Sequence, residues 1–428
     1  MNRKIKSFLL NDATLFKRKL FNWSEKFSTS IYLDSNKYPS RLGDIDAVLA
    51  CEVQAKLPFT DKDSLNKLKS FINKTNDWLF GYFSYDLKNE IEDLESDNNS
   101  QFSFPNLFFF QPKKIWIVKS NIVEAQYLNE SDIEKDWKQI NSINLLGNSK
   151  NSKSVKLVPK LSKNEYENKI KKILNHIHRG NIYEANFCME WCSTDTMINP
   201  EEVYKRLNFI SKTPMSAFFK QQNIYLLSTS PERFIKRIGN KIISQPIKGT
   251  SRRDSNKTVD LKLMRDLEEN PKERSENVMI VDLVRNDLSK FSISGSVKVT
   301  ELCKIYPFKQ VHQMISTVES KIDSKINIVD IIKSTFPMGS MTGAPKLKAL
   351  EIIEDLEVSK RGLYSGAIGY IDPNGDFDFN VVIRSLIYDS INNYLSFHVG
   401  SAITSNSTPE HEYEECLLKA KPMMSILK

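Results

Sequence analysis

The stretch GLYSGAIGYIDPNGDFDFNVVIRSLIYDSINNYLSFHVGSAIT, residues 362–404, has the pattern of an antiparallel β-meander. Apolar and polar residues alternate along it, which is typical of strands that bury one face. Turn-forming residues interrupt the alternation at Pro373-Asn374-Gly375 and at Asn392-Asn393. We therefore expect consecutive strands that pair with their neighbours along the chain.

Helical patterns lie on both sides of this stretch. Residues 164–180 place apolar side chains on one helical face and end at Gly180, a residue common at helix ends. We expect two more helices, over 272–290 and over 409–427, and Pro409 suits the first turn of the latter. Strands and helices together predict an α+β fold.

Polar stretches at 93–101 and 145–156 are predicted to be loops, and the second is the candidate domain boundary. It divides a sheet-rich N-terminal region, residues 1–145, from residues 157–428, where the side chains that could carry chemistry are found. The apolar runs predicted as N-terminal strands are 46–53, 78–87 and 106–118.

Composition excludes several classes of protein. With 40% hydrophobic and 27% charged residues, the chain is typical of globular proteins, and no apolar run approaches the roughly 18 residues of a membrane helix. We expect a cytoplasmic protein without a membrane partner. The net charge of +8 is spread along the chain, which favours an anionic small molecule or mere solubility over nucleic acid. The five scattered cysteines predict neither a disulfide framework nor a zinc site.

Two of the predicted helices carry paired carboxylates. Glu273 and Glu276 lie three residues apart on one helix, and Glu412 and Glu415 lie three apart on the last. Each pair alone is typical of a solvated helix face. If the helices meet, however, four carboxylates would repel one another unless a hard cation, most plausibly Mg²⁺, lay among them. Lys419 continues the same face of the last helix.

The segment FPMGSMTGAPKLKALEIIEDLE, residues 336–357, is predicted as a glycine-rich turn that leads into a helix. It lacks the G-K-[ST] of a nucleotide P-loop. Ser340 and Thr342 offer hydroxyls, and the helix N-terminus would suit a carboxylate. An ordinary capped helix is the alternative.

Other candidate residues are single side chains. Arg384 follows an apolar strand pattern and is suited to bidentate capture of a carboxylate. Tyr364 could donate a phenol hydroxyl or pack in the core, and His312 could be functional or structural. Lys248, in SQPIKGTSRR at residues 244–253, is either one more solvated lysine or an amine held by Pro246 and Gly249.

Taken together, these segments resemble the chorismate-utilising enzymes, which include anthranilate synthase component I, aminodeoxychorismate synthase component I, and the isochorismate and salicylate synthases. The segments that carry the resemblance occur in family order: SPERF, PIKGTSRR, ENVMIVDLVRNDLSK, FPMGSMTGAPK, RGLYSGAIGYI, VVIRS and EYEECLLKA, within residues 160–425. The resemblance implies one large α/β sandwich, in which two packed, antiparallel-rich sheets are flanked by helices and the active site lies in a cleft between them.

The resemblance also implies a substrate, a metal and their ligands. Chorismate would bind with Mg²⁺, held directly by Glu276 and Glu415 and supported by Glu273 and Glu412. The pyruvyl side of chorismate would meet Arg384, Tyr364 and Thr250, with backbone donors near Gly400 and Ser401. The remaining ring and carboxylate face would be lined by Thr342, His312 and Lys419.

Lys248 distinguishes members of the family. Anthranilate synthases typically have alanine there, whereas a lysine resembles the aminodeoxychorismate synthases. Its amine would attack C2 of chorismate and expel the C4 hydroxyl, after which ammonia would add at C4. We expect burial beside Mg²⁺ to lower the pKa of Lys248. Glu232 is the predicted general acid and base; a salt bridge to Arg233 or another cation is its alternative role.

The chain has no glutaminase motif of the G-x-C-x-G type, so the resemblance implies a separate glutamine amidotransferase subunit that supplies ammonia. The expected product is 4-amino-4-deoxychorismate, in p-aminobenzoate and folate biosynthesis. The alternatives are anthranilate synthase component I and a non-catalytic chorismate-binding subunit.

Some residues depart from the family pattern. Ser401-Ala402 replaces a stretch that is often glycine-rich, Glu184 stands where glutamine is usual, and Glu190 lies near a position that is often basic. The segment that feedback-inhibited anthranilate synthases use for tryptophan is not found, so regulation by tryptophan is not predicted.

Overall fold

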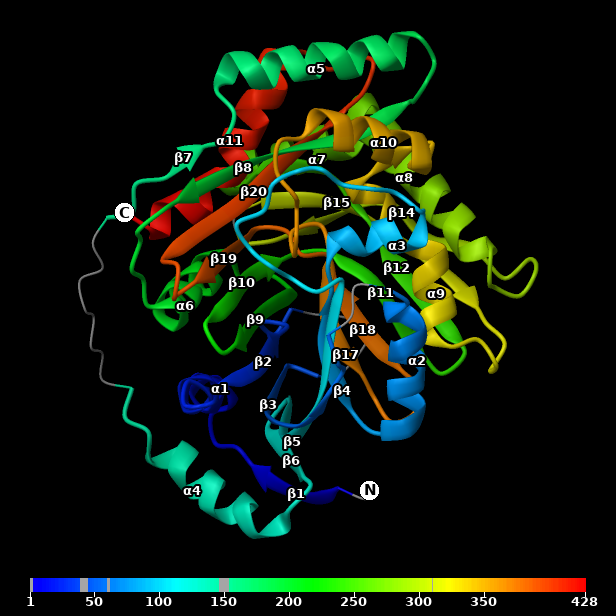
Figure 1. Ribbon diagram of the computed structural model, residues 1–428. Coiled ribbons are helices and arrows are strands. Elements are labelled where there is room, and N and C mark those ends of the chain that lie inside the picture. The colour runs from blue at the N-terminus through cyan, green and yellow to red at the C-terminus, as the bar shows by residue number, and fades with distance from the viewer. Residues whose placement is uncertain (1–2, 39–44, 60–61, 146–153, 310) are drawn as a thin grey trace.

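The computed structural model describes residues 3–38, 45–59, 62–145, 154–309 and 311–428 (Figure 1). Every pairing between named strands is antiparallel, and helices lie on both sides of the strands. The predicted α+β class is therefore confirmed. No helix in these ranges is long and apolar enough to cross a membrane.

One sheet extends from the N-terminal strand to the strands that carry Gly400 and Glu184. In spatial order it contains β1 (Lys4–Leu9), β6 (Ile122–Tyr127), β5 (Leu107–Lys119), β3 (Ala47–Lys56), β2 (Thr29–Asp34), β9 (Met215–Gln221), β10 (Ile224–Ser230), β19 (Ser385–Asp389), β20 (Tyr394–Ile403) and β8 (Glu184–Ser193), with β16 (Gly343–Ala344) and β7 (Val158–Pro159) on the far edge of β8.

A second sheet begins where the first part of β5 pairs with another strand. In spatial order it continues with β4 (Leu79–Phe83), β17 (Ala367–Ile371), β18 (Phe377–Asn380), β11 (Arg233–Ile238), β12 (Lys241–Gln245), β15 (Val311–Lys321) and β14 (Lys298–Pro307), and β13 (Ile247–Arg252) shares one edge of β15 with β12. The long strand β5 therefore joins the two sheets.

The side chains of β5 show how it serves both sheets. In its first half, Phe108 and Phe110 face the apolar layer between the sheets, and in its second half Ile115 and Ile117 do so. Trp116 faces the opposite side, toward the helices on the first sheet. Successive side chains of a regular strand point to opposite faces. Even-numbered residues face inward in the first half of β5 and odd-numbered residues in the second, so the strand has an irregularity between them. The pairing of β5 with β3 shifts register in this part.

Helices cover both outer faces of the paired sheets. Those on the first sheet are α1 (Ala13–Ser24), α4 (Ile133–Ser142), α5 (Lys163–His178), α6 (Pro200–Ser211), α10 (Lys346–Leu356) and α11 (Pro409–Ile426), and those on the second are α2 (Ser64–Thr75), α8 (Pro271–Ser289) and α9 (Ile328–Thr335). The remaining helical segments are η1 (Tyr85–Leu87), α3 (Lys88–Ile91), η2 (Glu130–Asp132), α7 (Lys257–Glu269) and η3 (Gly339–Met341).

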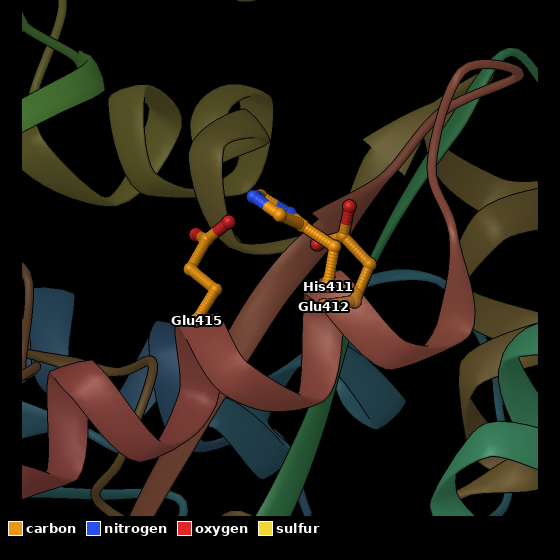
Figure 2. Close-up of side chains that lie close together, drawn as sticks. All are labelled: His411, Glu412 and Glu415. Atoms are coloured by element: carbon orange, nitrogen blue, oxygen red, sulfur yellow. The ribbon is translucent and has the colours of Figure 1, made fainter.

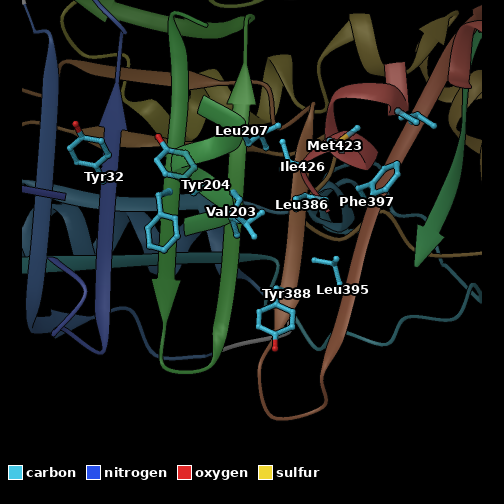
Figure 3. Close-up of a cluster of buried hydrophobic side chains, with 14 of the residues drawn as sticks. Tyr32, Val203, Tyr204, Leu207, Leu386, Tyr388, Leu395, Phe397, Met423 and Ile426 are labelled. Atoms are coloured by element: carbon cyan, nitrogen blue, oxygen red, sulfur yellow. The ribbon is translucent and has the colours of Figure 1, made fainter. Parts of the chain in front are cut away.

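The layers are held together by apolar packing. Figure 3 shows part of the outer layer on the first sheet, where Leu207 of α6 and Met423 of α11 lie near Leu386 of β19 and Phe397 of β20. The predicted arrangement of two packed sheets flanked by helices is confirmed.

The predicted helices are also confirmed. In α5, Ser162 and Glu165 form a capping box at the N-terminus, and Gly180 has a φ of +77° just after the C-terminus. The helices α8 and α11 begin at Pro271 and Pro409, where a proline costs no hydrogen bond.

The prediction of one continuous meander over residues 362–404 is wrong at one step. The hairpins β17–β18 and β19–β20 form as expected, but β18 pairs with β11 and β19 pairs with β10. Residues 381–384 therefore carry the chain from the second sheet to the first, and Arg384 lies in this crossing with a φ of +54°.

The two predicted regions share both sheets, because β2 pairs with β9 and β4 pairs with β17. Of the predicted boundary at residues 145–156, positions 146–153 lie outside the described residues. The division into residues 1–145 and 157–428 stays a prediction.

Candidate active site

Lys248 lies in β13 with its side chain largely buried. The side chain is 10% exposed, and its Nζ lies 2.7 Å from Oε1 of Glu184, at the start of β8 in the other sheet. The side-chain amide of Asn277 donates to the Lys248 carbonyl at 3.3 Å and fixes the backbone. Lys248 is therefore not a solvated lysine, and its amine lies between the two sheets.

Gly249 explains part of the motif around Lys248. Its φ of +92° lies in the left-handed region that favours glycine. A Cβ at this position would lie 3.1 Å from Oε2 of Glu273 and 3.2 Å from Cβ of Met314. Glycine is thus needed both for the backbone conformation and for the close approach of α8.

The protein residues alone do not lower the pKa of Lys248 as predicted. Burial by itself would lower that pKa, but the nearby carboxylates of Glu184, Glu276 and Glu415 outweigh burial and raise it. The amine therefore rests as an ammonium beside Glu184 and must lose a proton before it can act as a nucleophile.

Glu232 has the properties of a general acid and base. It lies between β10 and β11, is 4% exposed, and accepts a 2.7 Å hydrogen bond from Oγ of Ser340. Burial raises its pKa to about 7, although the Ser340 hydrogen bond and the charge of Lys248 act in the opposite direction. The alternative salt bridge is not found: Glu232 forms no ion pair among the described residues, and Arg233 instead pairs with Asp378 at 2.8 Å and lines a separate cavity of about 540 Å³.

The four predicted metal-binding glutamates lie on α8 and α11. Among the described residues, the group whose possible ligand atoms lie within 4.8 Å of one another consists of His411, Glu412 and Glu415 (Figure 2). His411 was not predicted from the sequence. Glu273 and Glu276 are outside this group, but repulsion from Glu415 contributes, after burial, to the raised pKa of Glu273.

These carboxylates fit a divalent cation. Glu412 is 1% exposed, and neither of its carboxylate oxygens has a hydrogen-bond partner among the described residues; Oε1 of Glu276 also has none. Burial raises the pKa of Glu276 to about 7, and repulsion from Glu273 and Glu184 adds to the effect. A hard cation with oxygen ligands, such as Mg²⁺, would satisfy these oxygens and relieve the repulsion.

Arg384 and Lys419 offer positive charge close to this cluster. Both line a cavity of about 40 Å³, together with Thr229 and Gln313. Burial lowers the pKa of Arg384, and the structure gives its guanidinium no ion pair within the described ranges. Lys419 contacts Glu415 at 2.7 Å and donates to the carbonyl of Gly400 at 2.8 Å. Two cationic side chains in one cavity suit an anionic ligand.

Gly400 and Tyr364 both lie close to the thiol of Cys188. A Cβ at Gly400 would lie 2.5 Å from Sγ of Cys188, so glycine is required for the close packing of β20 on β8. The Cys188 thiol in turn points to the Tyr364 hydroxyl at 3.8 Å. Burial raises the pKa of Tyr364 well above its usual value, so the phenol stays protonated and can donate.

Three other predicted residues have polar groups that already contact the protein, and a fourth, Thr250, is exposed. The Thr342 hydroxyl donates to the carbonyls of Met338 and Gly339, and the Ser401 hydroxyl contacts that of Tyr166 at 3.1 Å. His312 uses Nε2 to contact Asp260 at 3.0 Å. Thr250 lies in β13 and is exposed. The first three therefore help to shape loops and strands around the site.

Sequence reasoning missed the partner of Lys248. Glu184 was noted only because it replaces the usual glutamine, and nothing in the pattern of β8 links it to a lysine 64 residues away. Ser340 was noted as a hydroxyl donor, but its acceptor Glu232 lies 108 residues away in the chain. Only the packing of the two sheets brings these pairs together.

The molecule is an α+β sandwich in which the candidate residue Lys248, on β13 of one sheet, contacts Glu184, on β8 of the other. Residues 28–425 match the family described as chorismate binding enzyme. The chain belongs to this family, as the motifs in its sequence indicate.

Relatives within the family carry the names of different enzymes. An anthranilate synthase component I-like protein of Synechocystis sp. is 33% identical, covering 82% of this chain and 72% of that protein. Aminodeoxychorismate synthase component 1 of Bacillus subtilis is 30% identical, covering 81% and 76%. A crystal structure of anthranilate synthase component I from Streptococcus pneumoniae shares the fold, with a TM-score of 0.78 at 22% identity over 92% of this chain and 93% of that one.

Proposed function

We propose that this chain is component I of an aminodeoxychorismate synthase, which converts chorismate and ammonia to 4-amino-4-deoxychorismate for p-aminobenzoate and folate synthesis. The observation that carries the proposal is the Lys248 amine, held between the sheets and 2.7 Å from a buried carboxylate. An anthranilate synthase, which adds nitrogen at C2, has no use for a nucleophilic lysine there. The similarity to the Bacillus subtilis protein supports the same assignment.

The proposed reaction uses Lys248 and Glu232 in turn. The neutral amine attacks C2 and forms a C2–N bond, both conjugated double bonds of the ring shift toward C4, and the C4–O bond breaks. Glu232, whose pKa of about 7 allows both protonation states near neutrality, gives the leaving hydroxyl a proton, so that water departs. Ammonia then attacks C4, both ring double bonds shift back, the C2–N bond breaks, and Glu232 takes back a proton.

The substrate carboxylates would meet cationic groups of the chain. Arg384 and Lys419, which line one cavity, would bind the pyruvyl carboxylate, and Tyr364 would donate a hydrogen bond. Glu276, Glu412 and Glu415, supported by Glu273, would hold Mg²⁺, which would neutralise the ring carboxylate. A separate glutamine amidotransferase subunit would supply the ammonia. An ammonium salt can replace that subunit in an assay.

The test is the product formed by the purified chain. With chorismate, Mg²⁺ and an ammonium salt, we expect 4-amino-4-deoxychorismate by liquid chromatography and mass spectrometry, and no fluorescent anthranilate. Lys248→Ala should lose at least ~100-fold in rate, because it removes the nucleophile. Formation of anthranilate, or unchanged turnover in Lys248→Ala, contradicts the proposal.

Anthranilate synthase component I is the second candidate, favoured by the Synechocystis relative's name. It predicts anthranilate as the product and little effect of Lys248→Ala. A non-catalytic chorismate-binding subunit would give neither product, so the same assay separates all three functions.

A further inference from the structure

Glu184 is the one carboxylate among the described residues that forms an ion pair with Lys248. Its Oε1 lies 2.7 Å from Nζ, and its side chain is 1% exposed. Glu276 and Glu415 act on Lys248 only through longer-range attraction. Glu232 is committed to Ser340. The carboxylate oxygen that contacts the reacting nitrogen is therefore Oε1 of Glu184.

The backbone of Glu184 is held firmly. It pairs with Ala344 of β16, and a Cβ on the neighbouring Gly343 would lie 2.1 Å from the Glu184 carbonyl oxygen. On its other side, Ala185 pairs with Ile403 of β20. Because two strands fix β8 at this point, the carboxylate reaches Lys248 from a rigid position, as acid–base catalysis requires.

One oxygen of the Glu184 carboxylate is free of hydrogen bonds to the described residues. This oxygen is Oε2, and it is buried. Protonation of Glu184 therefore breaks no hydrogen bond except the one it shares with Lys248, and that contact survives with the roles of donor and acceptor exchanged. A side chain with only a structural role would more often have both oxygens satisfied.

We propose that Glu184 is the base that takes a proton from the Lys248 ammonium before the amine attacks the substrate. The proton passes from Nζ to the Glu184 carboxylate, which leaves a neutral amine and a neutral carboxylic acid. When Lys248 leaves C2 in the second half of the reaction, the proton returns to it, so the pair is restored after each turnover. This inference rests on the proposed nucleophilic role of Lys248.

The usual glutamine at this position would hold the lysine but could not accept its proton. Glu184→Gln is thus the decisive variant, because it keeps the shape and the hydrogen-bond acceptor of the side chain. Glu184→Asp keeps the carboxylate but shortens it. Glu190→Gln is a matched control: it removes another buried carboxylate from β8, one that pairs with Lys160 at 2.8 Å.

The experiment measures the adduct directly. Each variant is mixed with chorismate and Mg²⁺ without ammonia, quenched in acid, and examined for Lys248 carrying chorismate less one water by peptide mass spectrometry. We expect Glu184→Gln to form the adduct at least ~100-fold more slowly than wild type. Its KM for chorismate in the full reaction should stay within about threefold of the wild-type value, because glutamine keeps the shape of the side chain. Glu184→Asp should recover much of the rate, and Glu190→Gln should match wild type.

The outcomes separate the two proposals. A wild-type rate of adduct formation in Glu184→Gln overturns the role of Glu184 and leaves the nucleophile in place. Absence of any adduct in the wild type overturns the lysine mechanism, and the role of Glu184 with it. If Glu184→Gln folds poorly, a thermal unfolding scan shows this, and Glu184→Asp then decides: an adduct rate as low as that of Glu184→Gln contradicts the proposal.

Discussion

Oγ of Ser340, in the glycine-rich turn before α10, donates a 2.7 Å hydrogen bond to Oε1 of Glu232, which precedes β11. This hydrogen bond links the glycine-rich segment at residues 336–357 to Glu232, the predicted general acid. The hydroxyl stabilises the ionised carboxylate and so opposes the effect of burial, which raises the pKa of Glu232 to about 7. The turn therefore tunes the acid as well as beginning a helix.

Ser340→Ala should move the Glu232 ionisation to higher pH. Without the hydroxyl the carboxylate loses a donor, the protonated form is favoured, and the pKa rises further. If Glu232 acts as the acid, the alkaline limb of the pH profile of kcat/KM shifts upward. Ser244→Ala is the control, because that buried hydroxyl donates to the carbonyl of Phe234 instead. An unchanged limb in Ser340→Ala would remove this bond from the mechanism.

Arg384→Gln should weaken substrate binding without weakening the fold. The guanidinium is buried enough that its pKa is lowered, and the structure gives it no ion pair within the described ranges. A carboxylate of the substrate would be its partner, so KM for chorismate should rise at least ~10-fold, a loss of about 1.4 kcal/mol. The Tm should stay the same or rise, because an uncompensated buried charge is removed.

Arg233→Gln provides the contrast in stability. Arg233 pairs with the buried Asp378 at 2.8 Å, so its loss leaves part of that charge uncompensated and should lower the Tm. A fall in Tm for Arg384→Gln as large as that for Arg233→Gln would show that Arg384 is structural.

Mg²⁺ should stabilise the protein more at high pH than at low pH. Burial, with repulsion from Glu273 and Glu184, raises the pKa of Glu276 to about 7, well above the ordinary value of about 4.3. The stability from its protonated form is present below about pH 4.3 and is lost as pH rises through 7. A cation that pairs with the ionised carboxylates restores that stability.

Thermal scans at pH 5.5 and pH 8 test the metal site. At 100 times Kd the ion should add about 2.7 kcal/mol to the free energy of unfolding, and the gain in Tm should be larger at pH 8. Glu276→Gln should lose most of this pH dependence. An equal gain at both pH values, in wild type and variant alike, would place the ion elsewhere.

The sequence predicted those features that depend on local pattern. The helices α5, α8 and α11 were found because their apolar spacing and their terminal Gly180, Pro271 and Pro409 act over a few residues. The family motifs then implied the two packed sheets. The crossing at residues 381–384 was missed, because alternation along a strand says which residues are buried but not which sheet the strand joins.

The sequence named the candidate residues but not their pairings. Lys248, Glu232 and the four glutamates were named from motifs; the structure places the Lys248 amine beside Glu184, Glu232 beside Ser340, and the glutamates on α8 and α11. The contact of Lys248 with Glu184 depends on β8 and β13 facing each other across that layer. The same packing makes the pKa of Lys248 higher rather than lower, a result that needs the positions of three carboxylates.

Gly249→Ala should lower both stability and activity. A second glycine, Gly239, separates the effect of backbone strain from the effect of close contact with α8. Both Gly249 and Gly239 have positive φ, +92° and +58°, so alanine is strained at each by roughly 1–3 kcal/mol. A Cβ at Gly239 would meet nothing within 4 Å, whereas one at Gly249 would lie 3.1 Å from Oε2 of Glu273. Gly239→Ala should therefore lower the Tm with little change in kcat, and Gly249→Ala should also displace Glu273 or Lys248 and lower kcat. Urea unfolding and steady-state kinetics on both variants check this, and equal effects on kcat would show that the close approach of α8 to the lysine turn has no role in catalysis.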